Sequence, residues 1–254
     1  MIIAGLLFYI YKKNSDSELS FSRETAKKLL LAGKYYIISD IMVTIFAETD
    51  KIMLKNIVNS ESTAYYSAAL TCASLTSFVF VAILDSFRPI IFQSKKESNE
   101  NYELNLVRLF SVIIYMSLIQ SVLMAVFASL IISILYGSQY MQAVSALRIV
   151  VWYTTFAYLG SVRNIWILSE GKQRYLLPIN GMGATLNIIL NIVLIPKYGA
   201  NGAAFASLIT QIFTNVGTGL LLKDIRPVNT LMLKSLHPRY MFSMTKTVLN
   251  EIRK

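Results

Sequence analysis

The chain has 254 residues, of which 55% are hydrophobic and only 15% charged, and its mean hydropathy is +0.53. A soluble domain carries about 25% charged residues and cannot bury so much apolar surface. The hydrophobicity excludes intrinsic disorder, and a single cysteine, Cys72, excludes a disulfide-stapled secreted domain. The apolar runs are continuous, which excludes the alternating pattern of an outer-membrane barrel. We therefore predict an all-α integral membrane protein.

The net charge of +10 and the pI of about 9.6 would suggest nucleic-acid binding in a soluble protein. Zinc-finger spacing, an aromatic RNA-binding motif and a P-loop are missing from the sequence, so we predict no nucleic-acid partner. We expect basic loops that face the cytoplasm and an anionic inner leaflet. One histidine, His237, and one cysteine do not make a conventional metal site, and we predict no cofactor.

Six apolar stretches are long enough to cross a bilayer, which takes about 20 residues. They are 29–49, 64–92, 106–135, 143–168, 176–195 and 202–222. A seventh stretch, 1–11, is too short to span and is followed directly by Lys12 and Lys13. We interpret it as the remnant of a transmembrane helix, and we expect the chain to be the carboxyl-terminal part of a longer protein.

Lysine and arginine residues gather in alternate loops. Residues 12–28, 88–108, 170–175 and the tail after 222 hold 18 of the 24, whereas the loops between them hold three. This asymmetry follows the positive-inside rule. It predicts a cytoplasmic basic loop at 12–28, a six-helix lobe at 29–222 and a cytoplasmic basic tail at 223–254, broken by Pro227 and Pro238. Beyond Pro238 the tail is interpreted either as an amphipathic helix on the inner leaflet or as a mobile segment.

Several predicted spans gather polar residues on one helical face. These faces are Lys34, Asp40, Thr44, Glu48 and Lys51 on the first span; Arg148, Trp152, Thr155, Arg163 and Trp166 on the fourth; Asn180, Asn187 and Asn191 on the fifth; and Ser207, Thr210, Gln211, Thr214 and Thr218 on the sixth. A charge at a helix centre costs about 2.5–3.5 kcal/mol on insertion scales. A shared, wet and partly cationic cavity is therefore the less costly arrangement. The competing interpretation is that amide and hydroxyl stripes mediate helix packing.

Small residues mark the expected close contacts between the last two spans. Gly181, Gly183 and Ala184 open the fifth span, and Gly202, Ala203, Ala204 and Ala206 open the sixth. Gly202 and Ala206 form a small-xxx-small pair of the kind found at close helix interfaces. Pro196 and Gly199 predict a tight turn between the two spans.

Three motifs occur in a fixed order along the chain. They are Thr49-Asp50-Lys51-Ile52-Met53-Leu54, followed by Ala64-Tyr65-Tyr66-Ser67-Ala68-Ala69; then Ser86-Phe87-Arg88-Pro89-Ile90-Ile91-Phe92; then Pro196-Lys197-Tyr198-Gly199-Ala200-Asn201-Gly202-Ala203-Ala204-Phe205-Ala206. Together, over residues 30–222, they resemble the second half of the Wzx-type polysaccharide flippases, which are relatives of the MATE exporters.

This resemblance implies one lobe of a twelve-span, two-lobe fold with both termini in the cytoplasm. It implies translocation of undecaprenyl-pyrophosphate-linked oligosaccharide, an O-antigen or capsule repeat unit, across the bacterial inner membrane. Membrane lipid and a first lobe, or another copy of this chain, are the other implied partners. The expected mechanism is alternating access, with the substrate bound near the midplane.

Within this hypothesis the charged and aromatic residues take specific roles. Arg148 and Arg163 are predicted to bind the pyrophosphate, with Lys34 assisting. Trp152 and Trp166 are predicted to stack on sugar rings. Asp40 or Glu48 is predicted to carry a coupling proton or sodium ion.

Three alternatives stay open at this point. A MATE-like exporter of drugs or small molecules shares the fold, although an acidic cavity would suit it better than the mixed charge seen here. A membrane enzyme such as a glycan polymerase usually needs a large outer loop or a buried histidine. The outer loops here are short and His237 lies in the tail, so we predict that the chain is not an enzyme. A non-functional truncated product is the third alternative.

Overall fold

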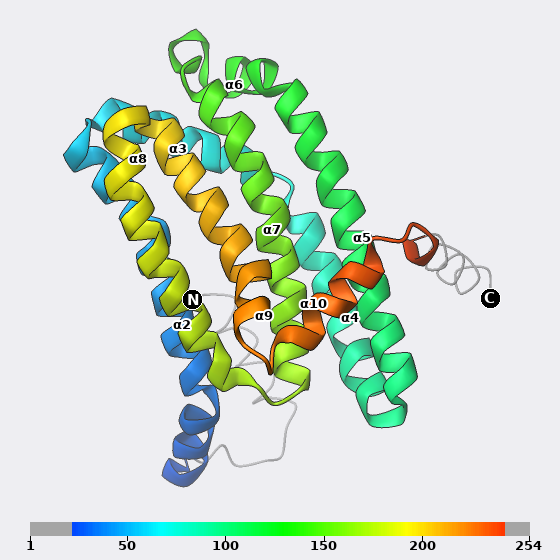
Figure 1. The fold of residues 1–254 in the computed structure, drawn as a ribbon. Helices are drawn as coiled ribbons and strands as arrows, with labels where there is room; N and C mark the ends of the chain where they lie inside the picture. The colour runs from blue at the N-terminus through cyan, green and yellow to red at the C-terminus, as the bar shows by residue number, and fades with distance from the viewer. Residues whose placement is uncertain (1–21, 242–254) are drawn as a thin grey trace, which may run out of the picture.

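The computed structural model describes residues 22–241 and leaves out some side chains of its first helix, that of Asp40 among them. The predicted remnant at 1–11, the first part of the loop 12–28 and the tail beyond Met241 lie outside the described residues. Within 22–241 the secondary structure is helical, without strands (Figure 1).

The described helices are, in chain order, α2 (Arg23–Ile57), α3 (Ser60–Ser74), α4 (Ser77–Glu97), α5 (Asn99–Val126), α6 (Ala128–Tyr136), η1 (Ser138–Tyr140), α7 (Ala143–Ser169), η2 (Gln173–Tyr175), α8 (Leu176–Ile212), η3 (Phe213–Gly217), α9 (Thr218–Leu221) and α10 (Arg226–Ser235). The long helices α2, α5 and α7 and both arms of α8 run along the bundle, whereas α6 and α10 lie across it (Figure 1). The segment α8 consists of two arms that meet at Gly199, where φ is 54° and ψ is −129°. Glycine adopts this conformation without a steric cost, and the predicted tight turn is confirmed.

Within residues 22–241, four helical segments are long and apolar enough to cross a membrane. They are Ser77–Glu97, Asn99–Val126, Ala143–Ser169 and Gln173–Leu221, the last of which includes the turn at Gly199. The prediction of a helical, multi-pass membrane protein is confirmed at this level. Two predicted spans are not continuous, because the stretch 64–92 breaks between Ser74 and Ser77 and the stretch 106–135 breaks at Phe127.

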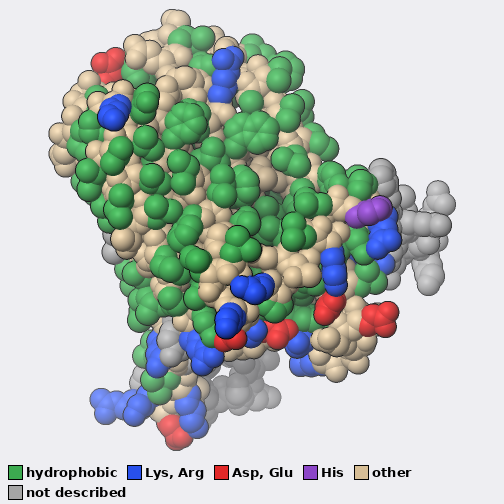
Figure 2. Space-filling view, viewed as in Figure 1, with side chains coloured by type: hydrophobic (Ala, Val, Ile, Leu, Met, Phe, Trp, Pro, Cys, Tyr) green, Lys and Arg blue, Asp and Glu red, His purple; other side chains and the backbone are tan. Residues whose placement is uncertain are grey.

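The surface is apolar around the bundle and charged toward its ends (Figure 2). Large exposed apolar side chains include Leu30, Ile41, Phe78, Ile119, Val126, Ile134, Ile189 and Ile192. Soluble monomers rarely expose such wide apolar patches, so a lipid environment accounts for this surface. The connections α4–α5, α7–α8 and α9–α10 share one end of the bundle, here named the basal end (Figure 1). Three of the predicted basic segments therefore meet there.

The helix α10 packs on the bundle, so part of the predicted tail belongs to the lobe. Its Val228, Leu231 and Met232 are buried against the basal ends of α5 and α9. The predicted break at Pro227 appears as the interruption between α9, which ends at Leu221, and α10, which begins at Arg226. Pro227 lies in the first turn of α10. Backbone N–H groups in the first turn have no acceptor within the helix, so the lack of an N–H in proline costs no helical hydrogen bond.

Small residues set the closest helix contacts, as the sequence predicts. Gly202, Ala203, Ala204 and Ala206 are all buried. A Cβ atom on Gly202 would lie 2.3 Å from the carbonyl oxygen of Leu194 in the other arm of α8. The two arms therefore approach too closely to admit a side chain at Gly202.

Gly202→Ala is expected to lower the free energy of unfolding by about 1–3 kcal/mol, as overpacking does in protein cores. The obstacle is a backbone carbonyl, which cannot rotate away. In the control variant Gly181→Ala the new Cβ meets only the flexible end of Met42, at 3.7 Å. Thermal unfolding in detergent compares the two variants, and equal melting temperatures would contradict this account of the hairpin.

Candidate functional site

A cavity of about 270 Å³, lined by both polar and apolar side chains, lies between α2, α7, α8 and η3. We name it the central cavity. Its lining includes Met42, Val43, Tyr153, Gly160, Arg163, Asn164, Asn180, Gly183, Gln211, Thr214 and Asn215. Part of each predicted polar face therefore lines the cavity: Arg163 from the fourth span, Asn180 from the fifth, and Thr210, Gln211 and Thr214 from the sixth.

Arg163 supplies a buried positive charge to this cavity, with only 3% of the residue exposed. Its Nη1 donates to the carbonyl oxygen of Thr214, and its Nη2 donates to Oδ1 of Asn164 at 3.1 Å. Among the described residues, its Nε has no hydrogen-bond partner and no carboxylate forms an ion pair with the guanidinium. A buried cation without a counter-charge is costly, so an anion in this cavity would stabilise it.

The π turn η3 provides the acceptor that holds Arg163. The carbonyl oxygen of Thr214 accepts both from Arg163 and from Oγ1 of Thr218, the latter at 2.6 Å. Gly160 allows α7 to approach this turn, because a Cβ there would lie 2.3 Å from Oδ1 of Asn215. π turns inside helices are frequent at functional sites. The π turn η3 and the small residue Gly160 together position the guanidinium of Arg163.

A second polar group, missed by the sequence reasoning, surrounds Asp50, which is 2% exposed. Its carboxylate accepts from the hydroxyl of Tyr66 at 2.8 Å, from Nδ2 of Asn191 at 2.6 Å and from the hydroxyl of Ser207. Nδ2 of Asn191 also donates to Oδ1 of Asn187 at 2.9 Å. We name these five residues the Asp50 cluster. It joins α2, α3 and both arms of α8.

The Asp50 cluster is rich in oxygen atoms and has no described basic partner. Oδ1 of Asn191 is buried and has no hydrogen-bond partner among the side chains that the structure describes. Carboxylate, amide and hydroxyl oxygens are the ligands that hard cations take, and a carboxylate can hold a proton instead. The sequence did point to these residues, because Asp50 belongs to the motif Thr49–Leu54 and because Asn187 and Asn191 share one face of the predicted fifth span. The predicted first span ended at residue 49, however, whereas α2 continues to Ile57.

The structure does not bring the predicted cations together. Arg163 lines the central cavity, but Arg148 is exposed and its Nε donates to the carbonyl oxygen of Ala125 at 3.3 Å. Fifteen helical residues, or roughly 22 Å, separate the two. Lys34 is exposed on α2. The substrate roles of Arg148 and Lys34 stay predictions.

Trp152, Trp166 and Glu48 do not line the central cavity. Trp152 is half-buried and packs against the apolar core that contains Leu54 and Val150. Trp166 is buried in a separate apolar core that contains Leu106 and Val228. Glu48 is exposed and pairs with Lys51 at 2.8 Å. The side chain of Asp40 is not among those described. Stacking and ion-coupling roles for these residues stay predictions.

Asp50→Ala is expected to lower the free energy of unfolding by about 1–3 kcal/mol, because it leaves buried donors unsatisfied. The matched variant Glu48→Ala removes an exposed ion pair, which is worth about 0–1 kcal/mol. Chemical or thermal unfolding in detergent distinguishes the two. If both variants unfolded like the parent protein, the Asp50 cluster would not stabilise the lobe.

Comparisons with known proteins agree with this architecture. A family model described as "Polysaccharide biosynthesis protein" matches residues 1–145, which is more than half of the chain. An uncharacterized membrane protein of Methanocaldococcus jannaschii is 29% identical over 202 residues, which is 78% of this chain and 39% of that protein. The chain thus spans about two fifths of the length of this curated relative. No solved structure matches the chain. The chain belongs to the polysaccharide biosynthesis protein family.

Proposed function

We propose that the chain is one lobe of a Wzx-type flippase that translocates lipid-linked oligosaccharide, the undecaprenyl-pyrophosphate-linked repeat unit of an O-antigen or capsule. The observation that carries the proposal is Arg163, a buried cation with no described counter-charge in the central cavity of a membrane lobe. The family match to polysaccharide biosynthesis supports the substrate class.

In this proposal Arg163 binds the pyrophosphate of the carrier lipid. Charge-assisted hydrogen bonds between guanidinium and phosphate are about twice as strong as neutral ones, and they gain further where water is scarce. Asn164, Asn180 and Gln211 line the same cavity and offer amide groups to sugar hydroxyls. A glycan with an anionic anchor therefore suits the cavity better than an apolar molecule.

A second lobe completes the proposed transporter. A central site between two lobes that rock against each other is the usual design of secondary transporters. We place the protein in the bacterial inner membrane, with the basal end and the carboxyl terminus in the cytoplasm, because the basic loops gather at that end. Arg148, Lys34, Trp152 and Trp166 keep their proposed substrate roles as secondary contacts.

Arg163→Gln tests the proposal in the full-length protein, in cells that depend on it for surface polysaccharide. A hydrogen bond to a charged group contributes roughly 1.5–3 kcal/mol to binding. We therefore expect Arg163→Gln to reduce export by about 10- to 100-fold. Arg163→Lys should retain part of the activity, because the charge remains. The exposed Lys96→Gln serves as the control. Surface polysaccharide is measured at matched protein levels, and unchanged export by Arg163→Gln would refute the role.

We also propose that Asp50 carries the coupling cation, a sodium ion or a proton. Of the two sequence-based candidates for this role, Glu48 is exposed and already paired with Lys51. The side chain of the other, Asp40, is not described. The Asp50 cluster places a buried carboxylate beside amide and hydroxyl oxygens from three helices.

A bound ion should stabilise the folded protein, and the stabilisation should rise with the ion concentration relative to its Kd. Sodium chloride is therefore expected to raise the melting temperature of the purified protein above that in choline chloride, and Asp50→Asn should abolish the rise. Glu48→Gln should leave it intact. If the coupling ion is a proton, sodium has no effect, and lowering the pH stabilises the parent protein but not Asp50→Asn. Identical responses of the parent and Asp50→Asn to both sodium and pH would rule out this assignment.

A further inference from the structure

A second cavity, of about 520 Å³, lies at the basal end between α4, α5, α7 and α10. We name it the basal cavity. Its charged lining consists of Lys95, Lys172, Lys223, Arg226 and Lys234 together with Glu103 and Glu170. None of these residues lines the central cavity.

The two carboxylates of the basal cavity are already engaged. Lys95 Nζ lies 2.5 Å from Oε1 of Glu170, and Lys234 Nζ lies 3.6 Å from Oε2 of Glu103. Burial opposes ionisation of Glu170, but the hydrogen bonds from Lys95 and Tyr102 and the nearby positive charges outweigh it and hold its pKa below the ordinary value. Glu170 is therefore ionised at neutral pH and balances Lys95.

Three cations of the basal cavity remain without a carboxylate partner among the described ion pairs: Lys172, Lys223 and Arg226. Asp224, which lies beside this lining, pairs instead with Arg174 at 3.7 Å. The basal cavity thus holds an excess of positive charge. Such an excess is relieved by a bound anion.

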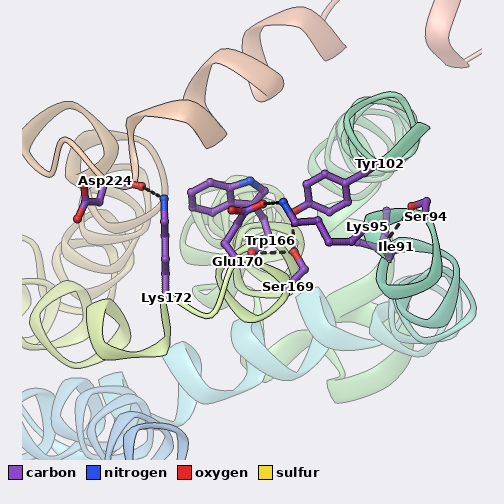
Figure 3. Close-up of polar contacts among 9 residues, drawn as sticks. All are labelled: Ile91, Ser94, Lys95, Tyr102, Trp166, Ser169, Glu170, Lys172 and Asp224. Carbon is purple, nitrogen blue, oxygen red and sulfur yellow. Dashed lines mark hydrogen bonds and ion pairs between the residues drawn. The ribbon is translucent and has the colours of Figure 1, made fainter. Parts of the chain in front are cut away.

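Lys172 is held in place, unlike a freely moving surface lysine (Figure 3). Its Nζ donates to the carbonyl oxygen of Asp224 at 2.8 Å and lies 4.7 Å from the centroid of the buried Trp166 ring. An ammonium group has three donors, and the described contacts account for one of them. The cation is therefore fixed before any ligand binds, which lowers the entropic cost of binding.

The surroundings of the basal cavity are amphiphilic. Leu233 of α10, the helix that supplies Arg226 and Lys234, is 68% exposed. Leu220 and Leu221 of the preceding helix, α9, are 63% and 62% exposed. A ligand with a phosphate and a hydrocarbon chain matches this combination better than a fully soluble anion. Basic pockets between helices at the cytoplasmic side of membrane proteins bind anionic headgroups.

We infer that the basal cavity binds the phosphate headgroup of an anionic phospholipid, with the acyl chains against the exposed leucines of α9 and α10. In this site Arg226 of α10 and Lys172 of the α7–α8 connection contact the phosphate. This site is separate from the one proposed for the transported oligosaccharide, and it does not depend on that proposal. Bound lipid would secure α10 to the basal ends of α5 and α7.

Thermal unfolding of the full-length protein in nanodiscs tests this inference. Discs that contain phosphatidylglycerol should raise the melting temperature relative to pure phosphatidylcholine, by on the order of 3 °C for a well-occupied site. The double variant Lys172→Gln/Arg226→Gln should lose most of this rise. Lys172→Arg, which keeps the charge, and Lys197→Gln, which removes a cation outside the basal cavity, should retain it.

Inorganic phosphate added to phosphatidylcholine discs distinguishes the two sources of phosphate. We expect little stabilisation from phosphate alone, because it gains nothing from the exposed leucines. An equal rise with inorganic phosphate, lost in the double variant, would overturn the assignment to lipid. No rise with phosphatidylglycerol, or a rise that survives in the double variant, would overturn the site itself. Equal melting temperatures of parent and double variant in pure phosphatidylcholine discs show that the variant folds.

Discussion

Hydrocarbon cannot hydrogen-bond a polar side chain, and this constraint explains where the lobe places its polar groups. Asp50 and Arg163 are buried inside the bundle, where amides, hydroxyls and a backbone carbonyl meet them. The outside is covered by exposed isoleucine, leucine and valine side chains. The fold is thus apolar outside and partly polar inside, and both candidate sites follow from that arrangement.

The central cavity and the Asp50 cluster share one structural element. Ser207 contacts Asp50, whereas Gln211 and Thr214 line the central cavity, and all three lie on the second arm of α8 and its continuation in η3. The first arm contributes Asn191 to one site and Asn180 to the other. A proposed ion that draws both arms toward Asp50 would thereby act on the walls of the proposed substrate cavity. Coupling through a shared packed element of this kind needs no long-range pathway.

Much of the architecture follows from sequence because lipid imposes strong rules. Composition predicts the helical membrane class, and Gly199 and Gly202 predict the turn and the close contact of the last two helices. The site is harder, because an ideal helical wheel gives an angle but not the neighbour that the side chain meets. Arg148 and Arg163 share a calculated face of α7, yet one is exposed and the other is buried against η3. Asp50 was missed because a hydropathy boundary was taken as the end of a helix that continues.

Water access to the central cavity tests this account most directly. In the full-length protein with Cys72 replaced by alanine, single cysteines at Gln211 and Ile189 are exposed to a membrane-impermeant thiol reagent. Gln211 lines the central cavity, and Ile189 is 54% exposed on the apolar surface. The account predicts rapid labelling of Gln211→Cys and none of Ile189→Cys. Labelling of Ile189→Cys with an unreactive Gln211→Cys would show a dry interior and contradict it.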